Sequence, residues 1–363
     1  MDFNLISSVF ETLRITPPSK LTLLEAHTLS SAHVPPFPPD MPALLVGINS
    51  LELFSQVKKV LMAAYPKEHE VSQVENSGVK VEALGRLQPA GLDSKTVSCL
   101  YIPALGEGTS FESFAEIVAH LRAPDGCPWD KEQTHQSLRT HLLEESYEAL
   151  SAMDENDNDG MREEFGDLLL QIVLNSQIGS ETESFSMTTV IKGIYDKIVR
   201  RHPHVFGDVE LSDVNGVLQN WEKLKEKERS GRKEDKGVLD GVPAALPSLT
   251  QAQEYQDRAA RVGFDWPSVD GVLDKIREEI EEIKAAKGLD EVTSELGDLF
   301  FVLVNLARWQ KVDAESALRG TNLKFKKRFG YVERSAKKLG RNLSDMTLEE
   351  MDLFWNEAKK LGM

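Results

Sequence analysis

The sequence predicts a mainly α-helical protein in which a small N-terminal α/β segment precedes two related helical bundles. Strand-like runs concentrate before residue 105, helical periodicity takes over after Phe111, and the helical part contains an internal repeat. We expect the α/β segment over residues 1–105, the first repeat over 108–228, a linker over 229–250 and the second repeat over 251–363.

The N-terminal segment shows an α/β pattern. Three short β-rich runs are "PALLVGI" (Pro42–Ile48), "HEVSQVE" (His69–Glu75) and "SCLYIPAL" (Ser98–Leu105). A helical stretch, "SLELFSQVKKVLMAAY" (Ser50–Tyr65), lies between the first two, and a proline-rich loop, His33–Pro42, leads into the first run. We therefore expect strands over these runs and one helix between them.

The helical part repeats itself, since several blocks recur in the same order at similar offsets. The pairs are "CPWD" (Cys127–Asp130) and "FDWP" (Phe264–Pro267); "LEESYE" (Leu143–Glu148) and "REEIEE" (Arg277–Glu282); "EEFGDLLLQIVL" (Glu163–Leu174) and "SELGDLFFVLVNL" (Ser294–Leu306); "DKIVRRH" (Asp196–His202) and "LKFKKRF" (Leu323–Phe329); and "NWEKLKE" (Asn220–Glu226) and "FWNEAKK" (Phe354–Lys360). Between the copies, Lys227–Pro247 is charged and then rich in glycine and proline, which is typical of a linker.

Composition excludes several classes of protein. The formal net charge of −17 argues against nucleic-acid polymers and anionic membranes as partners, because no positive field attracts them. No apolar run reaches the roughly 18 residues of a membrane span, and the N-terminus does not resemble a secretory signal. Cys99 and Cys127 are the only cysteines, without CxxC spacing, which suits a reducing compartment. We expect a cytoplasmic protein.

Carboxylates in the first repeat are spaced to share helix faces. Glu148 lies four residues after Glu144 and three after Glu145, and Asp167 lies three after Glu164. The intervening "SAMDENDNDGMR" reads as a short polar connection, so the two helices should pack antiparallel and bring these groups together. Like charges at low dielectric repel strongly unless cations intervene. All-oxygen ligands of this kind suit Mg²⁺ or Mn²⁺.

The simpler interpretation is an acidic helix face exposed to water. Two features favour metal binding instead. The same pattern recurs in the second copy, and in both copies the second acidic pair opens a helix too apolar to be fully solvated, such as "LLLQIVL". The second set is Glu278, Glu279, Glu282, Glu295 and Asp298.

Basic and aromatic residues also recur in both repeats. They are Lys197, Arg201, Trp221 and Lys225 in the first copy, and Lys324, Arg328, Trp355 and Lys359 in the second. A Lys–Arg pair at i, i+4 can hold phosphate oxygens, and a tryptophan can stack on a base. Taken singly, the basic pairs are equally well explained as surface charges, and a tryptophan belongs more often to a core than to a base-stacking site. Together with the carboxylates, they indicate a nucleoside polyphosphate ligand.

The repeats resemble the MazG nucleoside triphosphate pyrophosphohydrolases, within the all-α NTP pyrophosphatase superfamily. The resemblance rests on "PDGCPWDKEQTH" (Pro124–His135), which follows Ala123, on "LLEESYEAL" and "EEFGDLLLQIVL", and on the approach to the second repeat, Leu239–Trp266. It covers roughly residues 108–363 and is specific.

The resemblance implies a dimerising helical bundle that holds Mg²⁺ on its EExxE and ExxD carboxylates. It also implies cleavage between the α- and β-phosphates, which gives a nucleoside monophosphate and pyrophosphate. By position, the metal residues are Glu144, Glu145, Glu148, Glu164 and Asp167, and Glu278, Glu279, Glu282, Glu295 and Asp298. Asn322, Lys324, Arg328, Trp355 and Lys359 match the substrate side of the second repeat. Glu145 and Glu279 are our candidates for the general base.

The first copy departs from this pattern at one substrate position. It carries Tyr195 where the second has Asn322, and Asp196 where the second has Leu323. A tyrosine cannot reproduce the hydrogen bonding of the asparagine amide, and an added carboxylate would oppose a triphosphate. We expect both repeats to bind metal and the second to be the main catalyst.

Residues 1–105 are similar to the C-terminal half of a tetrapyrrole methylase domain. They lack the glycine-rich cofactor loop, so we expect them not to bind S-adenosylmethionine but to serve docking or dimerisation. The same absence disfavours a tetrapyrrole-linked methyltransferase. The remaining alternative is a non-catalytic module that binds nucleotide or metal to regulate a partner.

Overall fold

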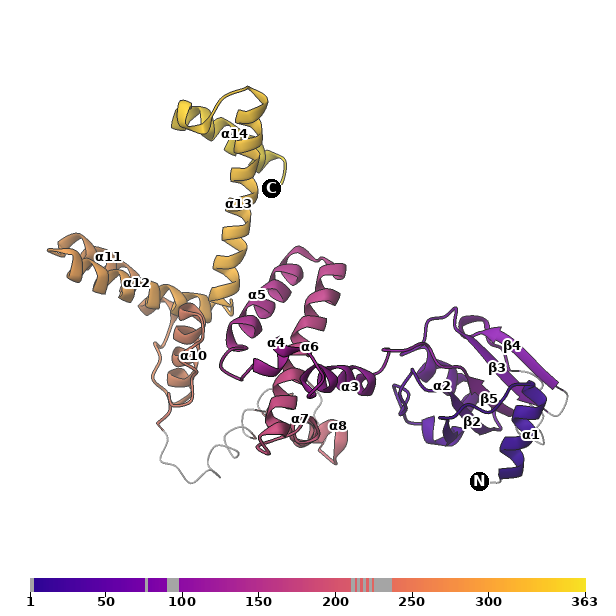
Figure 1. The fold of residues 1–363 in the computed structure, drawn as a ribbon. Coiled ribbons are helices and arrows are strands. Elements are labelled where there is room, and N and C mark those ends of the chain that lie inside the picture. Colours follow the sequence, from indigo (N-terminus) through magenta and orange to yellow (C-terminus); the bar gives the residue numbers. More distant parts are fainter. Residues whose placement is uncertain are drawn as a thin grey trace. The chain divides into compact units, whose positions relative to one another are not determined.

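The computed structural model describes residues 3–75, 78–89, 98–209, 213, 216–217, 220–221, 224 and 237–363. It divides into two compact units, Met1–Val209 and Glu210–Met363 (Figure 1). Helices predominate outside a small N-terminal sheet, so the predicted fold class is confirmed. None of the helices in these ranges is both long and apolar enough to cross a lipid bilayer.

The N-terminal part of the first unit is a five-stranded sheet with two helices. Its elements are α1 (Phe3–Leu13), β1 (Thr22–Glu25), β2 (Ala43–Ile48), α2 (Leu51–Leu61), β3 (Glu70–Glu75), β4 (Gly78–Ala83) and β5 (Ser98–Ile102). The strand order is β1-β2-β5-β3-β4, with β1 parallel to β2 and the other neighbours antiparallel. The three predicted strands and the helix are confirmed, whereas α1, β1 and β4 were not predicted.

The sheet buries both of its faces, because alternate side chains of a strand point to opposite sides. Leu44 and Val46 of β2 belong to one apolar cluster with Phe10 of α1. Leu45, between them in sequence, belongs to another cluster with Val57 of α2. One helix therefore covers each face.

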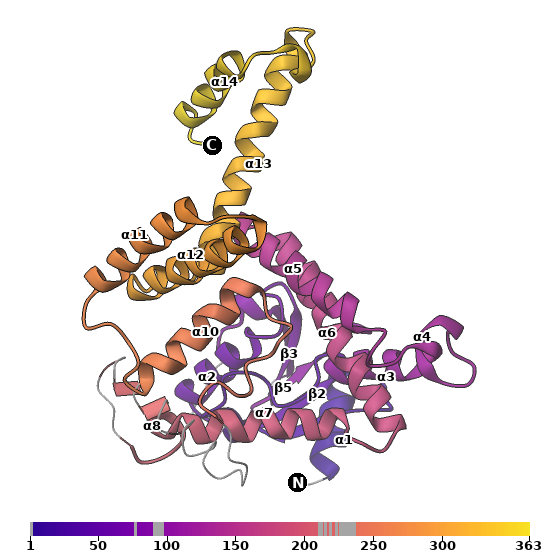
Figure 2. The same ribbon diagram turned by 90° about the vertical axis from the view of Figure 1, so that its left-hand side faces the viewer.

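The first helical repeat follows the sheet. It contains α3 (Phe111–Arg122), α4 (Pro128–Glu132), α5 (Arg139–Glu155), α6 (Asn158–Glu181), α7 (Met187–Arg201) and α8 (Pro203–Phe206). Helices α5 and α6 form an antiparallel hairpin, and α3 and α7 pack on α6 (Figure 2). The small core beneath α3 includes Val118, Leu138, Val173, Leu174 and Ile178.

The connection between α5 and α6 is shorter than the sequence predicted. We expected a polar loop over "SAMDENDNDGMR", but α5 continues to Glu155 and α6 begins at Asn158. Asn156 adopts a left-handed conformation with φ 54°, which ends α5. The Asp157 carboxylate accepts hydrogen bonds from the amides of Asp159 and Gly160, both at 3.1 Å, and so caps α6. This tight turn fixes the hairpin.

The second unit repeats the helix hairpin. It contains α10 (Ser248–Arg261), α11 (Val269–Ala285), α12 (Leu289–Trp309), α13 (Ala314–Lys338) and α14 (Leu348–Lys360). Helices α11 and α12 form the hairpin, α10 packs on α12 and on the start of α13, and α14 packs along α13 (Figure 2). Gln253 of α10 ties these helices together, since its side chain donates to the Val312 carbonyl and accepts from the Ala314 amide.

Candidate functional site

The α5–α6 hairpin gathers part of the first predicted carboxylate set. One oxygen each of Glu145, Glu164 and Asp167 lie within 4.8 Å of one another. Glu144 is exposed and lies 3.5 Å from Nδ1 of His141. Glu148 is also exposed, but its charge acts on both Glu145 and Glu164. Three carboxylates therefore converge, and two flank them.

This first group is electrostatically unfavourable without a cation. Burial, followed by the charges of Asp167 and Glu148, raises the pKa of Glu145. Burial and the charges of Glu148 and Asp167 likewise raise the pKa of Glu164. Both shifts favour the protonated carboxyl groups, as expected where like charges are forced together.

The α11–α12 hairpin forms the equivalent group. One oxygen each of Glu279, Glu295 and Asp298 lie within 4.8 Å of one another. Burial and the charges of Glu279 and Glu295 raise the pKa of Glu282, against the opposing effect of Lys275. Glu278 is exposed and forms an ion pair with Lys275 at 2.8 Å. The same three of five predicted positions converge in both repeats.

The donor atoms of these groups fit a hard divalent cation. All are carboxylate oxygens, the ligands that Mg²⁺ and Mn²⁺ prefer, and no cysteine or histidine belongs to either group. Glu279 is only 2% exposed, and its Oε2 has no hydrogen-bond partner in the part of the chain that the structure describes. A buried carboxylate oxygen without a partner is costly, so this atom is suited to receive a ligand.

On the substrate side of the second repeat, α13 and α14 bring together a cation and an aromatic cluster. The Arg328 guanidinium carbon lies 5.6 Å from the centre of the Trp355 ring, and Arg328 Nε donates to the Met363 carbonyl oxygen at 2.7 Å. The ring centre of Phe325 lies 5.3 Å from that of Trp355 and 5.9 Å from that of Phe329, on which it stacks. The other predicted residues, Asn322, Lys324 and Lys359, are exposed on the same two helices.

In the first repeat, α7 carries Lys197, which is exposed, and Arg201, which is half-buried. Lys192 forms an ion pair with Asp196 and lies 6.0 Å from the centre of the Tyr195 ring. Asp196 therefore has a neighbouring counter-charge on its own helix. Trp221 is half-buried, whereas the predicted Lys225 lies outside the described residues.

The two halves of the second predicted site do not meet within one chain. The N-terminal end of α13 packs on α10 and α12, whereas α14 packs along its C-terminal half. Figures 1 and 2 both show α13 running away from the α11–α12 hairpin. The carboxylates and the Arg328–Trp355 cluster are consequently separate groups in this unit.

Two residues near the carboxylates were missed in the sequence. Lys275 Nζ lies 2.6 Å from Glu279 Oε1, and His141 holds the equivalent position in the first repeat, four residues before Glu145. The signal was available, because i and i+4 residues are neighbours on a helix.

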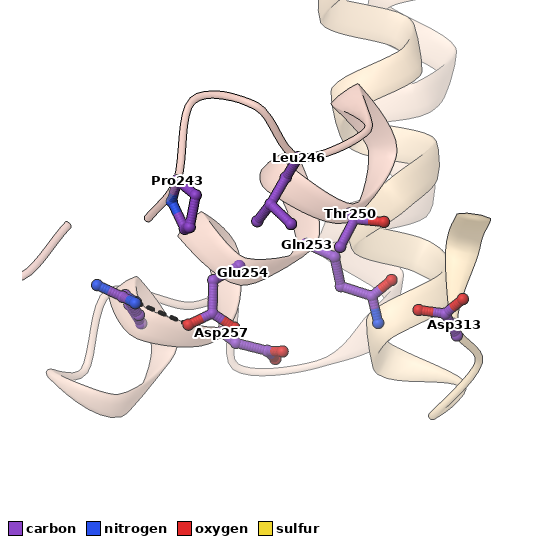
Figure 3. Close-up of a pocket in the computed structure, with 8 residues that line it drawn as sticks. Pro243, Leu246, Thr250, Gln253, Glu254, Asp257 and Asp313 are labelled. Carbon is purple, nitrogen blue, oxygen red and sulfur yellow. Dashed lines mark hydrogen bonds and ion pairs between the residues drawn. The ribbon is translucent and has the colours of Figure 1, made fainter. Parts of the chain in front are cut away.

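A shallow pocket in the second unit lies apart from these groups (Figure 3). Its lining residues are Pro243, Leu246, Thr250, Gln253, Glu254, Asp257, Arg258 and Asp313. Arg258 donates to Glu254 at 2.8 Å and to the Asp240 carbonyl at 2.8 Å, and burial raises the pKa of Asp257. Arg258 thus holds the segment before α10 against this helix. The polar residues of the pocket are therefore explained by their role in the fold.

Two acidic helix hairpins, each converging three carboxylates, define the class: a mainly α-helical protein with a duplicated carboxylate group whose donor atoms suit a hard cation. Comparison with protein families agrees with this class. The MazG nucleotide pyrophosphohydrolase domain matches residues 133–206, and the phosphoribosyl-ATP pyrophosphohydrolase family matches residues 249–322. Each match contains one carboxylate hairpin.

Individual relatives match two thirds or more of the chain. The nucleoside triphosphate pyrophosphohydrolase/pyrophosphatase MazG of Thermotoga maritima is 42% identical over 69% of this chain and 96% of its own. The Escherichia coli (strain K12) nucleoside triphosphate pyrophosphohydrolase is 42% identical over 67% and 95%. The uncharacterized protein YabN of Bacillus subtilis is 40% identical over 98% and 74%. The chain belongs to the MazG family of nucleoside triphosphate pyrophosphohydrolases.

We expect Mg²⁺ to raise the melting temperature more at about pH 7 than at about pH 5. Glu145 and Glu164 have raised folded-state pKa values, so their contribution to stability is complete below the ordinary value of 4.5 and is lost as pH rises through the folded-state values. A bound cation offsets that loss only where the carboxylates are ionised. Scanning fluorimetry with Mg²⁺ or with EDTA measures the difference, which we expect to grow by a few degrees.

Glu164→Gln should remove much of this pH-dependent gain. Glu155→Gln, which removes an exposed carboxylate at the end of α5, is the control and should retain it. An equal gain at both pH values would contradict the electrostatic account of the first group.

Proposed function

We propose that this protein hydrolyses nucleoside triphosphates between the α- and β-phosphates, releasing a nucleoside monophosphate and pyrophosphate with Mg²⁺, or Mn²⁺, as cofactor. The observation that carries the proposal is the duplicated convergence of three carboxylates on a helix hairpin. Family membership supports it, because relatives that match about two thirds of this chain, 69% and 67%, are named nucleoside triphosphate pyrophosphohydrolases.

The carboxylates divide into inner and flanking groups. Glu145, Glu164 and Asp167, and Glu279, Glu295 and Asp298, would hold the cation, while the flanking Glu144, Glu148, Glu278 and Glu282 add negative charge around it. When bound, the cation neutralises phosphate charge and increases the acidity of a water molecule. Glu279 would accept the proton of the attacking water in the second repeat. Glu145 would have this role in the first repeat.

The cations of α13 and α14 would hold the nucleotide. Arg328 offers a planar fork for phosphate oxygens, and Lys324 and Lys359 add exposed ammonium groups nearby. Phe325 and Trp355 provide aromatic faces for a base. Lys197, Arg201, Trp221 and Lys225 would be the first-repeat equivalents. A nucleoside triphosphate can contact the carboxylate-bound cation, the basic side chains and the aromatic rings together.

A homodimer would cover exposed apolar stripes on both hairpins. On α6, Phe165, Leu169 and Ile172 are 50%, 39% and 47% exposed. On α12, Leu296, Phe300 and Leu303, at the equivalent positions, are 38%, 57% and 42% exposed. Large apolar side chains at i, i+4 and i+7 form a continuous stripe that favours a helical partner. A second copy could also bring its α13–α14 pair to these carboxylates.

The N-terminal segment and the cell compartment are also part of the proposal. Residues 1–105, which resemble part of a tetrapyrrole methylase domain, would act as a docking segment without binding S-adenosylmethionine. Two unpaired cysteines and the acidic composition support a cytoplasmic protein without membrane or nucleic-acid polymer partners.

We expect the full chain with Mg²⁺ to convert nucleoside triphosphates to equimolar monophosphate and pyrophosphate. Activity should disappear in excess EDTA, because the converging carboxylates then repel the triphosphate. Chromatography of the nucleotides and a pyrophosphate assay give the two products. Orthophosphate as the first product would exclude the proposed bond, and tight nucleotide binding without turnover would favour the regulatory module.

We expect the second repeat to be the main catalyst, because Asn322 offers an amide where the first repeat has Tyr195. Glu279→Gln should lower kcat by about 100-fold or more, as for loss of a general base. Glu145→Gln, the same substitution in the first repeat, should cost far less. Glu155→Gln on exposed α5 is a charge control. The opposite ranking of the two substitutions would assign catalysis to the first repeat.

We expect the chain to be a dimer or larger assembly at micromolar concentration. Leu169→Asp together with Phe300→Asp should dissociate it, because each places a charge on an apolar stripe. Light scattering coupled to gel filtration measures the mass. Leu348→Asp, on a 75% exposed side chain of α14, is the control. A stable wild-type monomer would instead indicate that the two repeats cover each other within one chain.

A further inference from the structure

The second carboxylate group contains its own cation. Lys275 Nζ lies 2.6 Å from Glu279 Oε1 and 2.8 Å from Glu278 Oε1. The Glu279 side chain is 3% exposed, whereas that of Lys275 is 33% exposed. The ammonium group therefore lies at the boundary between the buried carboxylate and solvent.

This ion pair offsets the cost of burying a carboxylate. A carboxylate buried beside Glu295 and Asp298 requires a positive charge, and the lysine one helical turn earlier supplies it without any other part of the fold. A lysine side chain is protonated at neutral pH, so the group that faces Glu278 and Glu279 is an ammonium ion. Only one oxygen of Glu279 is satisfied in this way, since Oε2 has no partner among the described atoms.

The first repeat is built differently at the same place. His141 occupies the position of Lys275, and its Nδ1 lies 3.5 Å from Glu144 rather than from the central Glu145. No ion pair of Glu145 occurs within the described ranges of the chain. The two otherwise matched groups thus differ by one fixed ammonium group on the central glutamate.

We propose that Lys275 is a tethered counter-ion whose positive charge opposes a divalent cation at Glu279, so that the first repeat loads metal at lower concentrations than the second. The proposal rests on the metal assignment made above and adds an order of loading to it. A cation on Oε2 would lie close to the ammonium group on Oε1, so the two positive charges repel each other, and moving Lys275 away costs the ion pair. The second group is consequently held together without metal, and its loading depends on the divalent concentration.

The test is a titration of the full chain with Mn²⁺. The electron paramagnetic resonance signal of free Mn²⁺ measures how much is bound. Asp167→Asn disables the first group and Asp298→Asn the second, so each chain reports on one group. We expect the second group to bind Mn²⁺ at least about tenfold more weakly than the first. Adding Lys275→Met to the Asp167→Asn chain should lower the Kd of the second group by about tenfold.

Matched controls isolate the role of the tether. Lys275→Arg keeps the charge and should leave the Kd unchanged, and so should Lys284→Met, which removes an exposed lysine paired with Glu281 on the same helix. In EDTA, Lys275→Met should also lower the melting temperature, because it leaves Glu279 buried without a counter-charge. Equal Kd values for the two groups, or a Kd unaffected by Lys275→Met, would overturn the proposal.

If the Lys275→Met chain does not fold, the reciprocal substitution in the first repeat tests the proposal. His141→Lys in the Asp298→Asn chain should weaken Mn²⁺ binding to the first group, and an unchanged Kd would overturn the proposal. Failure of both groups to bind Mn²⁺ would defeat the metal assignment itself. Tight binding by both groups at the same Kd would defeat only the counter-ion.

Discussion

Both repeats depend on holding three carboxylates close together across a helix hairpin against their mutual repulsion. The short turn at Asn156–Asp157, with the αL residue and the capping carboxylate, sets the positions of α5 and α6. The hairpin of α11 and α12 turns at Gly288, whose φ of +106° favours a glycine. These rigid connections keep Glu145 opposite Glu164 and Asp167, and Glu279 opposite Glu295 and Asp298. Preorganisation of this kind lets a cation bind without first ordering its ligands.

The two repeats resolve the repulsion in different ways. In the first, the raised pKa values of Glu145 and Glu164 show that the ionised state is disfavoured in the absence of a cation. In the second, Lys275 supplies a positive charge from within α11. A duplicated hairpin can therefore keep the same ligands while differing in how readily it accepts an ion. Divergence of this kind requires only one residue on the helix, because position 275 lies one turn from Glu279.

Much of this arrangement was predictable from local sequence. The β-rich runs over 42–48, 69–75 and 98–105 became strands, and carboxylate spacing placed the right residues on facing helices. Strand β1 was missed because "TLLE" is only four residues long, and β4 because "GVKVEA" is a largely exposed strand at the sheet edge. Spacing could not tell which three of five carboxylates converge, since that depends on how each helix is rotated against its partner. The predicted acidic loop became helix because Asp157 caps α6.

The apolar stripes give a physical reason for two copies of the chain to associate. On α6, successive residues are about 100° apart, so Phe165, Leu169 and Ile172 share a face that differs from the face of Glu164 and Asp167. The partner helix α5 occupies the carboxylate face and cannot also cover the stripe. The same geometry holds for Leu296, Phe300 and Leu303 on α12, whose carboxylate face meets α11. The Arg328–Trp355 cluster meanwhile lies on α13–α14, away from the carboxylates of its own chain (Figure 2). Association of two copies would thus bury the apolar stripes. It would also allow the cationic groups of one copy to meet the carboxylates of the other. The same contact would then stabilise the hairpins and complete the site.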